Sequence, residues 1–518
     1  MAYIVEQKIK GRIYLYEVES YWDKEKKQPR QRRKYIGPKE PKKKSEIKTK
    51  QSHLITRNFG NIFLLNFISE KLGITEILKS CFPEYYPEIL ALAYFEIMEG
   101  SALYLFPYWI DEQFLPNTKK LYSPGISNLC EDVGRSQAQR FEFIQKWIDH
   151  LKPINGIYYD ITSISAYGTN IDFIEWGYNR DREDLPQLNM GVIFCQNNSL
   201  PIFYNIYPGS IVDVTTLKNC IKYMNVCNLK DILLVLDRGF FSKSNVLELN
   251  KEKNTAKFII PLPFRLKKVK ELLKKNKKYI RNPVNSFKFK EEVLFHLKES
   301  VEFDQEEFDA HVFSNEKAEV HQRHSFLSCL LDIENKVKNR QLKTLKEYMV
   351  YKESGIPEKY RKYFKWNKKT LKIEKNIRKI KEYISSMGSF ILLTNQKNMS
   401  RADVLDHYRK KDSVEKVFDI VKNEIDGKRL RVHSSFNNEG RLFIKFIALI
   451  LYTEISRTMH KEKLFNKYSV KEIMAELKKL KVTVIDNSEP IVSELTKKHK
   501  TILKTFKIEE ADVTVHSY

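Results

Sequence analysis

Short apolar runs in the middle of the chain predict strands, and apolar residues at helical spacing between them predict helices. The helices are expected over Val214–Met224 and Lys243–Lys251, and a turn at Asn197-Asn198 joins two of the strands. The predicted strands are Gly156–Thr162, Leu188–Cys195, Pro201–Tyr207, Asp231–Asp237 and Lys257–Pro261. Antiparallel strands followed by a strand–helix–strand crossover are typical of an α/β protein with a mixed sheet.

A second pattern has the period of a helix and covers Arg401–Glu424. The stretch contains no Pro or Gly, and Ser400 or Asp403 can cap its start. Apolar residues fall on one arc, which is the face expected to pack on a core. A neighbouring arc about 60° wide holds Tyr408, Lys411, Glu415 and Lys422. One carboxylate is therefore expected among cations and a phenol, although an ordinary amphipathic helix with a solvated charged side would show the same pattern.

The first 150 residues divide into two predicted segments. Residues 1–50 begin with alternating runs that predict a hairpin turning at Gly11. They become strongly basic over Lys24–Lys44, which we interpret as an arm suited to phosphate contacts, with a solvated tail as the alternative. Residues 51–150 are rich in helical periodicity and predict an all-α domain for DNA binding or dimerisation.

The rest of the chain is predicted to be a core interrupted by an insertion. Residues 151–262 and 399–460 form the two parts of the core, the second including a buried helix over Gly440–Arg457, and residues 461–518 form a polar, Lys-rich tail with one helix near Val470–Leu480. Residues 263–398 form the inserted subdomain. Its predicted elements are strands at Ser286–Glu291, Glu307–Phe313 and Ser389–Thr394, and helices around Ile333–Tyr348 and Lys369–Tyr383.

Composition narrows the class of protein. The 518 residues carry a net charge of +25, which favours a polyanionic partner, while a solvated basic surface is the alternative. The longest apolar runs, Ile89–Phe95 and Phe446–Thr453, are far shorter than the roughly 18 residues of a membrane span. Six cysteines without a C-x-x-C pair indicate reduced thiols in a cytosolic protein. Eleven histidines without H-x-x-x-H spacing argue against a zinc hydrolase.

Three acidic residues offer a site for phosphoryl transfer. Asp160 and Asp237 each follow an apolar strand, where a carboxylate is costly without a partner or a metal ion. Glu415 from the later helix would complete a set of hard oxygen ligands of the kind that Mg²⁺ prefers. Two such ions, about 3.5–4 Å apart, can activate an attacking oxygen and stabilise a leaving one. The competing acids have ordinary interpretations: solvated pairs with arginines for Asp181, Glu183 and Asp184, and a helix cap for Asp213.

These motifs together resemble the DDE-type transposases of bacterial insertion sequences. Tyr408, Lys411, Glu415 and Lys422 reproduce the Y-x2-R-x3-E-x6-K signature of one branch, with Lys in place of Arg. Segments 159–163 and 236–240 are similar to the family's motifs around its first and second Asp, and segments 207–217 and 429–434 also look like family segments. The resemblance covers roughly residues 125–262 and 388–457.

The resemblance implies an α/β, RNase H-like mixed sheet with an inserted, largely β subdomain. It implies that Asp160, Asp237 and Glu415 bind two Mg²⁺ ions, for which Mn²⁺ can substitute. Water would cut one strand at the element end, and the freed 3′-OH would attack DNA. Relatives in this branch pass through a hairpin with a flipped base stacked on an aromatic residue, for which Trp366 is a candidate.

The same resemblance assigns partners. Tyr408, Lys411 and Lys422 would hold DNA phosphates, and Arg238 is a further DNA-binding candidate. Because an ammonium cannot make the bidentate contact of a guanidinium, Arg409 can replace Lys411 at the phosphate. The implied partners are double-stranded DNA of the element ends and of the target, and a second copy of the chain that pairs two ends. The expected location is the cytoplasm, at the nucleoid, without a membrane.

Two other functions are compatible with the sequence. The first is a catalytically silent DNA-binding regulator derived from a transposase, which the three intact acids disfavour. The second is an RNase H-like nuclease without strand transfer, which would give simple nicks in place of joined or hairpin DNA.

Overall fold

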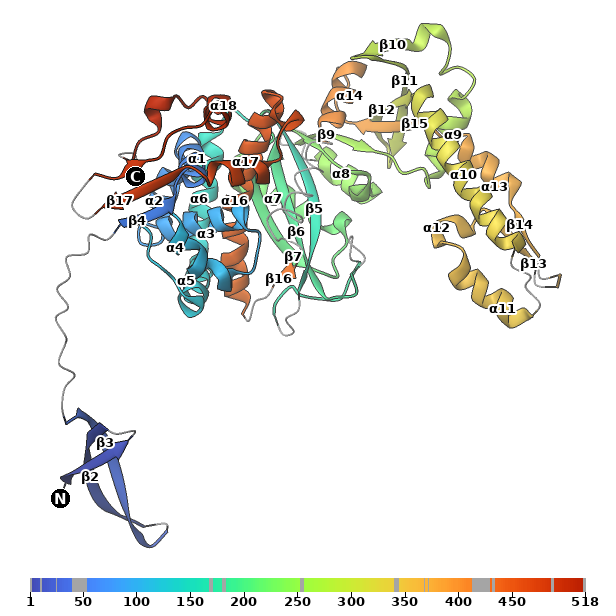
Figure 1. The fold of residues 1–518 in the computed structure, drawn as a ribbon. Coiled ribbons are helices and arrows are strands. Elements are labelled where there is room, and N and C mark those ends of the chain that lie inside the picture. The colour runs from blue at the N-terminus through green and yellow to red at the C-terminus, as the bar shows by residue number, and fades with distance from the viewer. Residues whose placement is uncertain are drawn as a thin grey trace. The chain divides into compact units, whose positions relative to one another are not determined.

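The computed structural model groups the chain into two compact units, and each is described by itself (Figure 1). One unit comprises Met1–Ile55 with Ile485–Glu489, and the other comprises Thr56–Val484 with Pro490–Tyr518. The structure describes residues 2–9, 12–24, 26–39, 54–166, 171–178, 183–251, 256–339, 344–367, 369–370, 372–411, 429–430, 434–485 and 489–515.

The smaller unit is built on a three-stranded antiparallel sheet in the order β1-β2-β3. β1 (Ala2–Ile9) and β2 (Arg12–Asp23) form the predicted hairpin, with Ile9 opposite Arg12. β3 (Gln28–Pro38) falls where the sequence predicted an arm, so that prediction is wrong over these residues. β3 is an edge strand, and Pro and basic residues are tolerated on edges because one side of the strand needs no hydrogen-bonded neighbour.

The larger unit is organised on a ten-stranded mixed sheet, and the predicted core strands are all present. Their bounds are β5 (Gly156–Ala166), β6 (Gln187–Cys195), β7 (Pro201–Pro208), β8 (Ile232–Val235) and β9 (Ala256–Pro261). The sheet order is β10-β11-β12-β15-β9-β8-β5-β6-β7, and β16 (Arg429–Leu430) also pairs with β5. β5, β6 and β7 form an antiparallel meander, whereas β8 and β9 run parallel to β5. α7 (Asp213–Val226) and α8 (Lys243–Lys251) make the connections that the sequence predicted.

The insertion differs from the predicted, largely β subdomain. Its strands β10 (Ser286–Phe289), β11 (Glu292–Phe303), β12 (Glu306–Ser314) and β15 (Ser389–Thr394) continue the core sheet beyond β9. Much of the remainder is helical: α9 (Lys267–Asn276), α10 (Glu316–Asn339), α11 (Leu345–Val350), α12 (Glu358–Arg361) and α13 (Ile377–Ile384). A small second core, which includes Phe326, Leu330 and Ile356, lies under these helices.

Both long Lys-rich helices predicted in the insertion are wrong in extent. The first is divided between α10 and α11, and Thr344 caps the new helix by accepting a hydrogen bond from the Glu347 N–H at 3.2 Å. The second contains β14 (Lys372–Lys375), paired with β13 (Phe364–Asn367), before α13 begins. Asn376 caps α13 in the same way. The capping residues Thr344 and Asn376 thus mark helix boundaries that the spacing of residues along the sequence did not predict.

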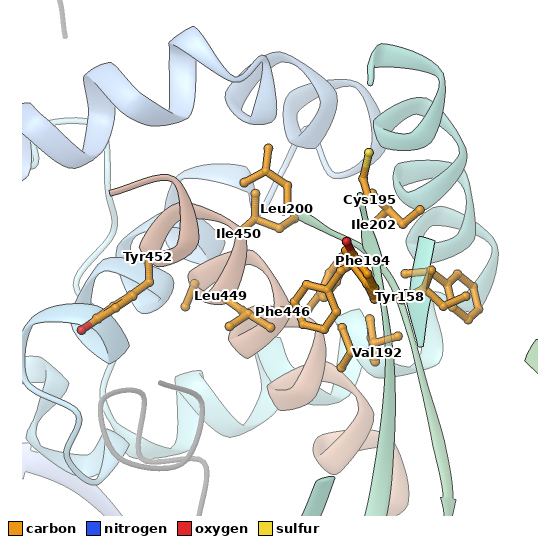
Figure 2. Packing of buried hydrophobic residues seen from close by; sticks show 14 of the residues in the cluster. Tyr158, Val192, Phe194, Cys195, Leu200, Ile202, Phe446, Leu449, Ile450 and Tyr452 are labelled. Atoms are coloured by element: carbon orange, nitrogen blue, oxygen red, sulfur yellow. The ribbon is translucent and has the colours of Figure 1, made fainter. Parts of the chain in front are cut away.

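A mostly helical layer covers one side of the core strands. It contains β4 (Leu54–Asn58), α1 (Gly60–Lys71), α2 (Ile74–Cys81), α3 (Tyr86–Met98), α4 (Phe106–Glu112), α5 (Ser123–Arg135) and α6 (Gln137–His150). The predicted buried helix is α16 (Ser435–Lys461), which lies between this layer and the sheet. Phe446 packs against Tyr204 of β7 with ring centroids 4.8 Å apart, and Phe443 packs against Phe143 of α6 at 5.3 Å. Figure 2 shows Phe446 of α16 beside Val192 and Phe194 of β6.

The crossing of α5 and α16 depends on glycine. A Cβ on Gly134 of α5 would lie 1.8 Å from the Phe436 carbonyl oxygen of α16. We expect Gly134→Ala to lower the free energy of unfolding by about 1–3 kcal/mol, because the helices must separate. Gly125→Ala in the same helix is the control, since its nearest contact would be 3.5 Å away. Urea unfolding followed by tryptophan fluorescence measures both variants, and equal midpoints would contradict the prediction.

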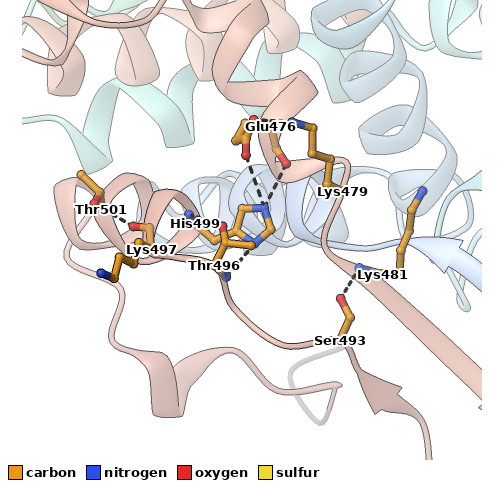
Figure 3. A network of polar contacts seen from close by, with 8 residues as sticks. All are labelled: Glu476, Lys479, Lys481, Ser493, Thr496, Lys497, His499 and Thr501. Atoms are coloured by element: carbon orange, nitrogen blue, oxygen red, sulfur yellow. Dashed lines mark hydrogen bonds and ion pairs between the residues drawn. The ribbon is translucent and has the colours of Figure 1, made fainter.

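The C-terminal segment is part of the folded unit, so the prediction of a polar tail is wrong. α17 (Val470–Leu477), β17 (Lys481–Ile485), β18 (Ile491–Val492) and α18 (Lys497–Thr505) contribute buried side chains such as Ile473, Leu477, Ile502 and Phe506. His499 joins α18 to α17, with its Nε2 3.2 Å from the Glu476 carbonyl oxygen and its Nδ1 accepting from the Thr496 N–H at 3.3 Å (Figure 3). Apolar residues spaced between many lysines supply this packing.

A buried histidine pair predicts a stability change in mild acid. His296 Nε2 of β11 lies 3.0 Å from His311 Nδ1 of β12. Burial, and then the charge of His311, lower the pKa of His296 to about 3. Burial, and then Lys298, lower the pKa of His311 to about 4. The unfolded chain keeps pKa values near 6.5, so between pH 6.5 and 4 it binds more protons than the folded chain, and stability falls as the pH falls.

Urea midpoints across this pH window measure the effect. The parent should lose stability on acidification, and His296→Gln should show a shallower dependence because one titrating group is gone. Parallel pH profiles for the parent and the variant would contradict the assignment.

Within the described residues, no single helix is both long and apolar enough to cross a membrane. One pair of helical segments, Tyr86–Met98 and Leu103–Glu112, reaches that length and composition only across a bend of 111°.

Candidate functional site

Asp160 lies in β5, and Asp237 lies just beyond the end of the adjacent parallel strand β8. The pairing of β5 with β8 sets Tyr158 against Val235, and each aspartate comes two residues later in its own segment. Neighbouring strands lie roughly 4.8 Å apart, so this register brings the two carboxylates to one place on the sheet. Asp160 is inside β5, further from the strand's end than predicted, and Asp237 precedes the 3₁₀ turn η2 (Arg238–Phe240) that follows β8.

The ammonium group of Lys411 lies beside both carboxylates. Its Nζ is 3.8 Å from Asp160 Oδ2 and 3.9 Å from Asp237 Oδ1. The Lys411 side chain is only 3% exposed. At these separations the interactions are ion pairs and not hydrogen bonds. One buried cation therefore compensates two acids that would otherwise repel each other across the sheet.

A hydrogen-bonded contact fixes the helix that carries Lys411. α14 (Arg401–Lys410) begins at Ser400, whose hydroxyl accepts from the Asp403 N–H at 3.1 Å, as one of the two predicted caps. The Tyr158 hydroxyl donates to the His407 carbonyl oxygen at 3.3 Å. The Gln196 amide donates to the Tyr158 hydroxyl at 3.0 Å and also contacts His407 Nδ1. These contacts hold the end of α14 against the face of β5 that carries Asp160.

The imidazole in this contact is uncharged near neutral pH. Burial, and then the charge of Lys410, lower the pKa of His407 below its ordinary value. A neutral ring can accept the Gln196 N–H at Nδ1. No sequence pattern predicts this role, since neither Gln196 nor His407 belongs to a motif with metal or catalytic spacing. The signal becomes visible only through the strand pairing that brings β6 beside β5.

The aromatic and arginine residues predicted to bind DNA have distinct surroundings. The ring of Tyr408 stacks on Phe390 of β15, with centroids 6.4 Å apart. Arg409 is directed toward the insertion, where its Nη2 is 2.7 Å from Glu292 Oε2. Arg238 is exposed, adjacent to Asp237, and lies over the Phe264 ring at 5.2 Å. The structure thus brings Lys411 and Arg238 near the aspartates and turns Arg409 toward β11.

Glu415 and Lys422 lie outside the described residues, so the predicted acidic and basic positions of this helix stay predictions. The described residues on either side of segment 412–428 show where this part of the chain leaves and rejoins the core. Lys411 lies beside the aspartates, and β16 pairs with β5 at Ser165 and Ala166. Glu415 follows Lys411 by four residues, which is at most about 14 Å of extended chain. The chain therefore leaves the aspartates at one end of the segment and returns to the same strand at the other.

The candidate stacking residue Trp366 lies in β13 of the insertion. Its indole is half-buried and meets Tyr348 edge-on with ring centroids 5.7 Å apart. Its Nε1 donates to the Arg361 carbonyl oxygen at 3.5 Å. In the structure this tryptophan belongs to the small second core of the insertion.

The described residues supply part of a ligand set for a divalent cation. Two carboxylates supply hard oxygen atoms, and the nearby ammonium shows that this place on the sheet accommodates a positive charge. Thr162, two residues beyond Asp160 on β5, has a buried hydroxyl without a hydrogen-bond partner among the described residues. The described part of the chain contains no cluster of three or more His, Cys, Asp or Glu side chains that could hold a metal ion. A third carboxylate must come from elsewhere.

A family model for the transposase DDE domain matches residues 152–451. The match covers more than half of the chain, both core parts and the insertion. The chain belongs to the DDE transposase family. The resemblance to DDE-type transposases is therefore confirmed, and the Y-x2-R-x3-E-x6-K branch stays a prediction.

A second comparison concerns solved structures. The chain is similar to a piggyBac transposase in a synaptic complex with hairpin DNA, at 10% sequence identity and a TM-score of 0.33, over 81% of this chain and 70% of the other. At this TM-score the two folds do not superpose closely, and the similarity adds nothing to the site. No curated protein matches the chain.

Proposed function

We propose that this DDE transposase binds the inverted-repeat ends of an insertion sequence, cleaves them and transfers the freed ends to target DNA. The observation that carries the proposal is the position of Asp160 in β5 and of Asp237 just beyond the adjacent parallel strand β8, both within 4 Å of one buried ammonium. The order β7-β6-β5-β8-β9, a meander followed by two parallel strands, supports an RNase H-like core. In this core Asp160 lies in the central strand β5, and Asp237 lies two residues beyond its neighbour β8.

The proposed third carboxylate is Glu415. It follows Lys411 closely enough to reach the aspartates, and it completes a set of three acids. Two Mg²⁺ ions, or Mn²⁺ in their place, would supply a polarised scissile phosphate and an activated oxygen nucleophile when bound there. The task of the chain is to hold three carboxylates rigidly, and β5 and β8 do so for two of them through their hydrogen-bonded register.

Lys411 has a different position from the phosphate contact expected of it. We assign it the role of a charge partner that offsets the repulsion between the two aspartates and holds them close together. Tyr408, Lys422 and the exposed Arg238 then serve as contacts to the DNA backbone. Arg409 contributes through its ion pair with Glu292, which ties α14 to β11.

The proposal includes a second copy of the chain, with each copy acting at one of two paired ends, and a hairpin formed at the element end. The excess of 91 Lys and Arg over 66 Asp and Glu supports a double-stranded DNA partner. The proposed location, at the nucleoid in the cytoplasm, follows from that partner.

The test uses labelled duplexes carrying the inverted repeats that bound this reading frame. With Mg²⁺ the parent protein should nick the ends, form hairpin products and join the ends to a plasmid target. End-specific binding without any cleavage would instead identify a silent regulator. Nicks without hairpin or joined products would identify a nuclease.

A further inference from the structure

α9 and α13 border two adjoining cavities in the insertion. The larger has a volume of about 750 Å³ and the smaller about 490 Å³. The two cavities share Leu273, Lys277 and Ser385 in their linings, so they form one continuous depression, called here the α9–α13 groove. None of the predicted site residues that the structure describes lines it.

The groove is strongly basic. Among the described residues, nine Lys and Arg side chains line it, against two carboxylates. Lys270, Lys274 and Lys277 recur about one turn apart along α9, which gives a row of positive charge roughly 10 Å long. Lys379 faces this row from α13. Such an excess of one sign in a concave surface attracts an extended anion.

The two carboxylates of the groove are already paired. Glu319 accepts from both Arg281 and Arg323, and Glu382 Oε1 lies 3.1 Å from Lys270 Nζ. Within the described residues no carboxylate forms an ion pair with Lys274, Lys277 or Lys379. Three ammonium groups along the groove therefore keep their charge available for a ligand.

The floor of the smaller cavity has buried donors. Asn276 is 4% exposed and Ser314 is 1% exposed, and both line the cavity. Neither Asn276 Nδ2 nor Ser314 Oγ has a hydrogen-bond partner in the described part of the protein. Buried polar groups normally have hydrogen-bond partners, because burying one without a partner costs about 1–3 kcal/mol. An anionic oxygen in the cavity would accept from both.

Aromatic side chains stand beside the cations in the larger cavity. Phe264, Tyr363 and Tyr383 line it, and the rings of Tyr363 and Tyr383 lie 5.4 Å apart. Aromatic rings beside cations are found on nucleic-acid-binding surfaces, and the row of cations itself matches the charge of a phosphate backbone. A single small anion would use only a fraction of the row of lysines on α9.

We propose that the α9–α13 groove binds the phosphate backbone of double-stranded DNA, at a site built on elements other than those that carry Asp160 and Asp237. The inference rests on the proposed function, since it supplies the insertion with a role in holding the DNA of transposition. The groove makes contacts through charge and hydrogen bonds to phosphate oxygens, so it fixes position without reading sequence.

The test compares two triple variants in the full chain. Lys274→Gln/Lys277→Gln/Lys379→Gln removes the groove charges, and Lys467→Gln/Lys497→Gln/Lys504→Gln removes three exposed charges elsewhere. Fluorescence anisotropy gives the Kd for a random-sequence duplex of about 40 bp, without Mg²⁺, between about 50 and 300 mM NaCl. The groove variant should bind at least about tenfold more weakly at 100 mM salt, and its slope of log K against log salt should fall by about 3. The control should change Kd by less than about threefold.

Protection of lysines supplies an independent readout. DNA should shield Lys274, Lys277 and Lys379 of the parent from acetylation, as measured by mass spectrometry, and leave Lys497 reactive. Equal salt slopes for the parent and the groove variant, or equal losses in both triple variants, would overturn the proposal. So would full acetylation of the three groove lysines in the DNA complex.

The groove and the proposed function can fail separately. If the parent cleaves ends and the groove variant binds DNA as tightly as the parent, the groove proposal is wrong and the transposase proposal stands. If the groove variant binds DNA more weakly but the parent never cleaves with Mg²⁺, the groove proposal stands and the catalytic assignment is wrong.

Discussion

Asp237→Asn is expected to lower Mg²⁺-dependent end cleavage by about a thousandfold or more while the protein stays folded. The substitution keeps the shape of the side chain and removes the charge of one carboxylate in the facing pair. Lys411 then faces a single aspartate, so the site loses a ligand and its charge balance together. The measurement is single-turnover cleavage of an end-bearing duplex.

Asp231→Asn is the matched control for that variant. Asp231 immediately precedes β8, and Asp237 follows its end, so both substitutions change one acid at an end of the same strand. Asp231 has a positive φ of 57°, a conformation that Asn also adopts, and its partner Lys257 lies on the neighbouring strand. The control should cleave within about twofold of the parent. Normal cleavage by Asp237→Asn would remove Asp237 from the site.

The sequence was sufficient to predict the core sheet. Its strands are short apolar runs with turn residues between them, so pattern and structure agree at β6, β7, β9 and β15. The apolar runs also predicted that Asp160 and Asp237 each come at the end of a strand, whereas the adjacency of these two strands is known only from the sheet order. The exact register, which sets Tyr158 against Val235, is a property of the paired backbone and has no local signature.

The predictions failed in segments where many charged residues obscure the spacing of the buried apolar residues. β3 and the C-terminal segment are rich in Lys and Arg, and their apolar residues are too widely spaced to give a clear period. α9 (Lys267–Asn276) is plainly basic in sequence, yet the groove that it borders requires α13, about a hundred residues later in the chain. Contacts between distant segments decide such features, and composition alone does not locate them.

The position of Lys411 gives a physical reason for finding Lys where the Y-x2-R-x3-E-x6-K signature has Arg. A guanidinium is planar and larger, whereas an ammonium is a compact charge on a flexible stem. The compact ammonium occupies a position that is 3% exposed and within 4 Å of two carboxylates. Lys at this position therefore suits a charge partner for the aspartates better than a bidentate phosphate contact.

Lys445→Met is expected to destabilise the larger unit by about 3–5 kcal/mol. Lys445 of α16 and Glu96 of α3 are 4% and 2% exposed, and their Nζ and Oε2 atoms are 2.7 Å apart. The substitution removes the cation and leaves the Glu96 carboxylate buried between the helical layer and α16. A buried charge without its partner is far more costly than either the pair or an apolar replacement.

The double variant Glu96→Met/Lys445→Met separates this cause from a packing defect. It removes both charges and keeps apolar volume, so its stability should return to within about 1–2 kcal/mol of the parent. Urea unfolding of the three proteins measures these effects. A double variant as unstable as Lys445→Met would show that packing and not charge is responsible.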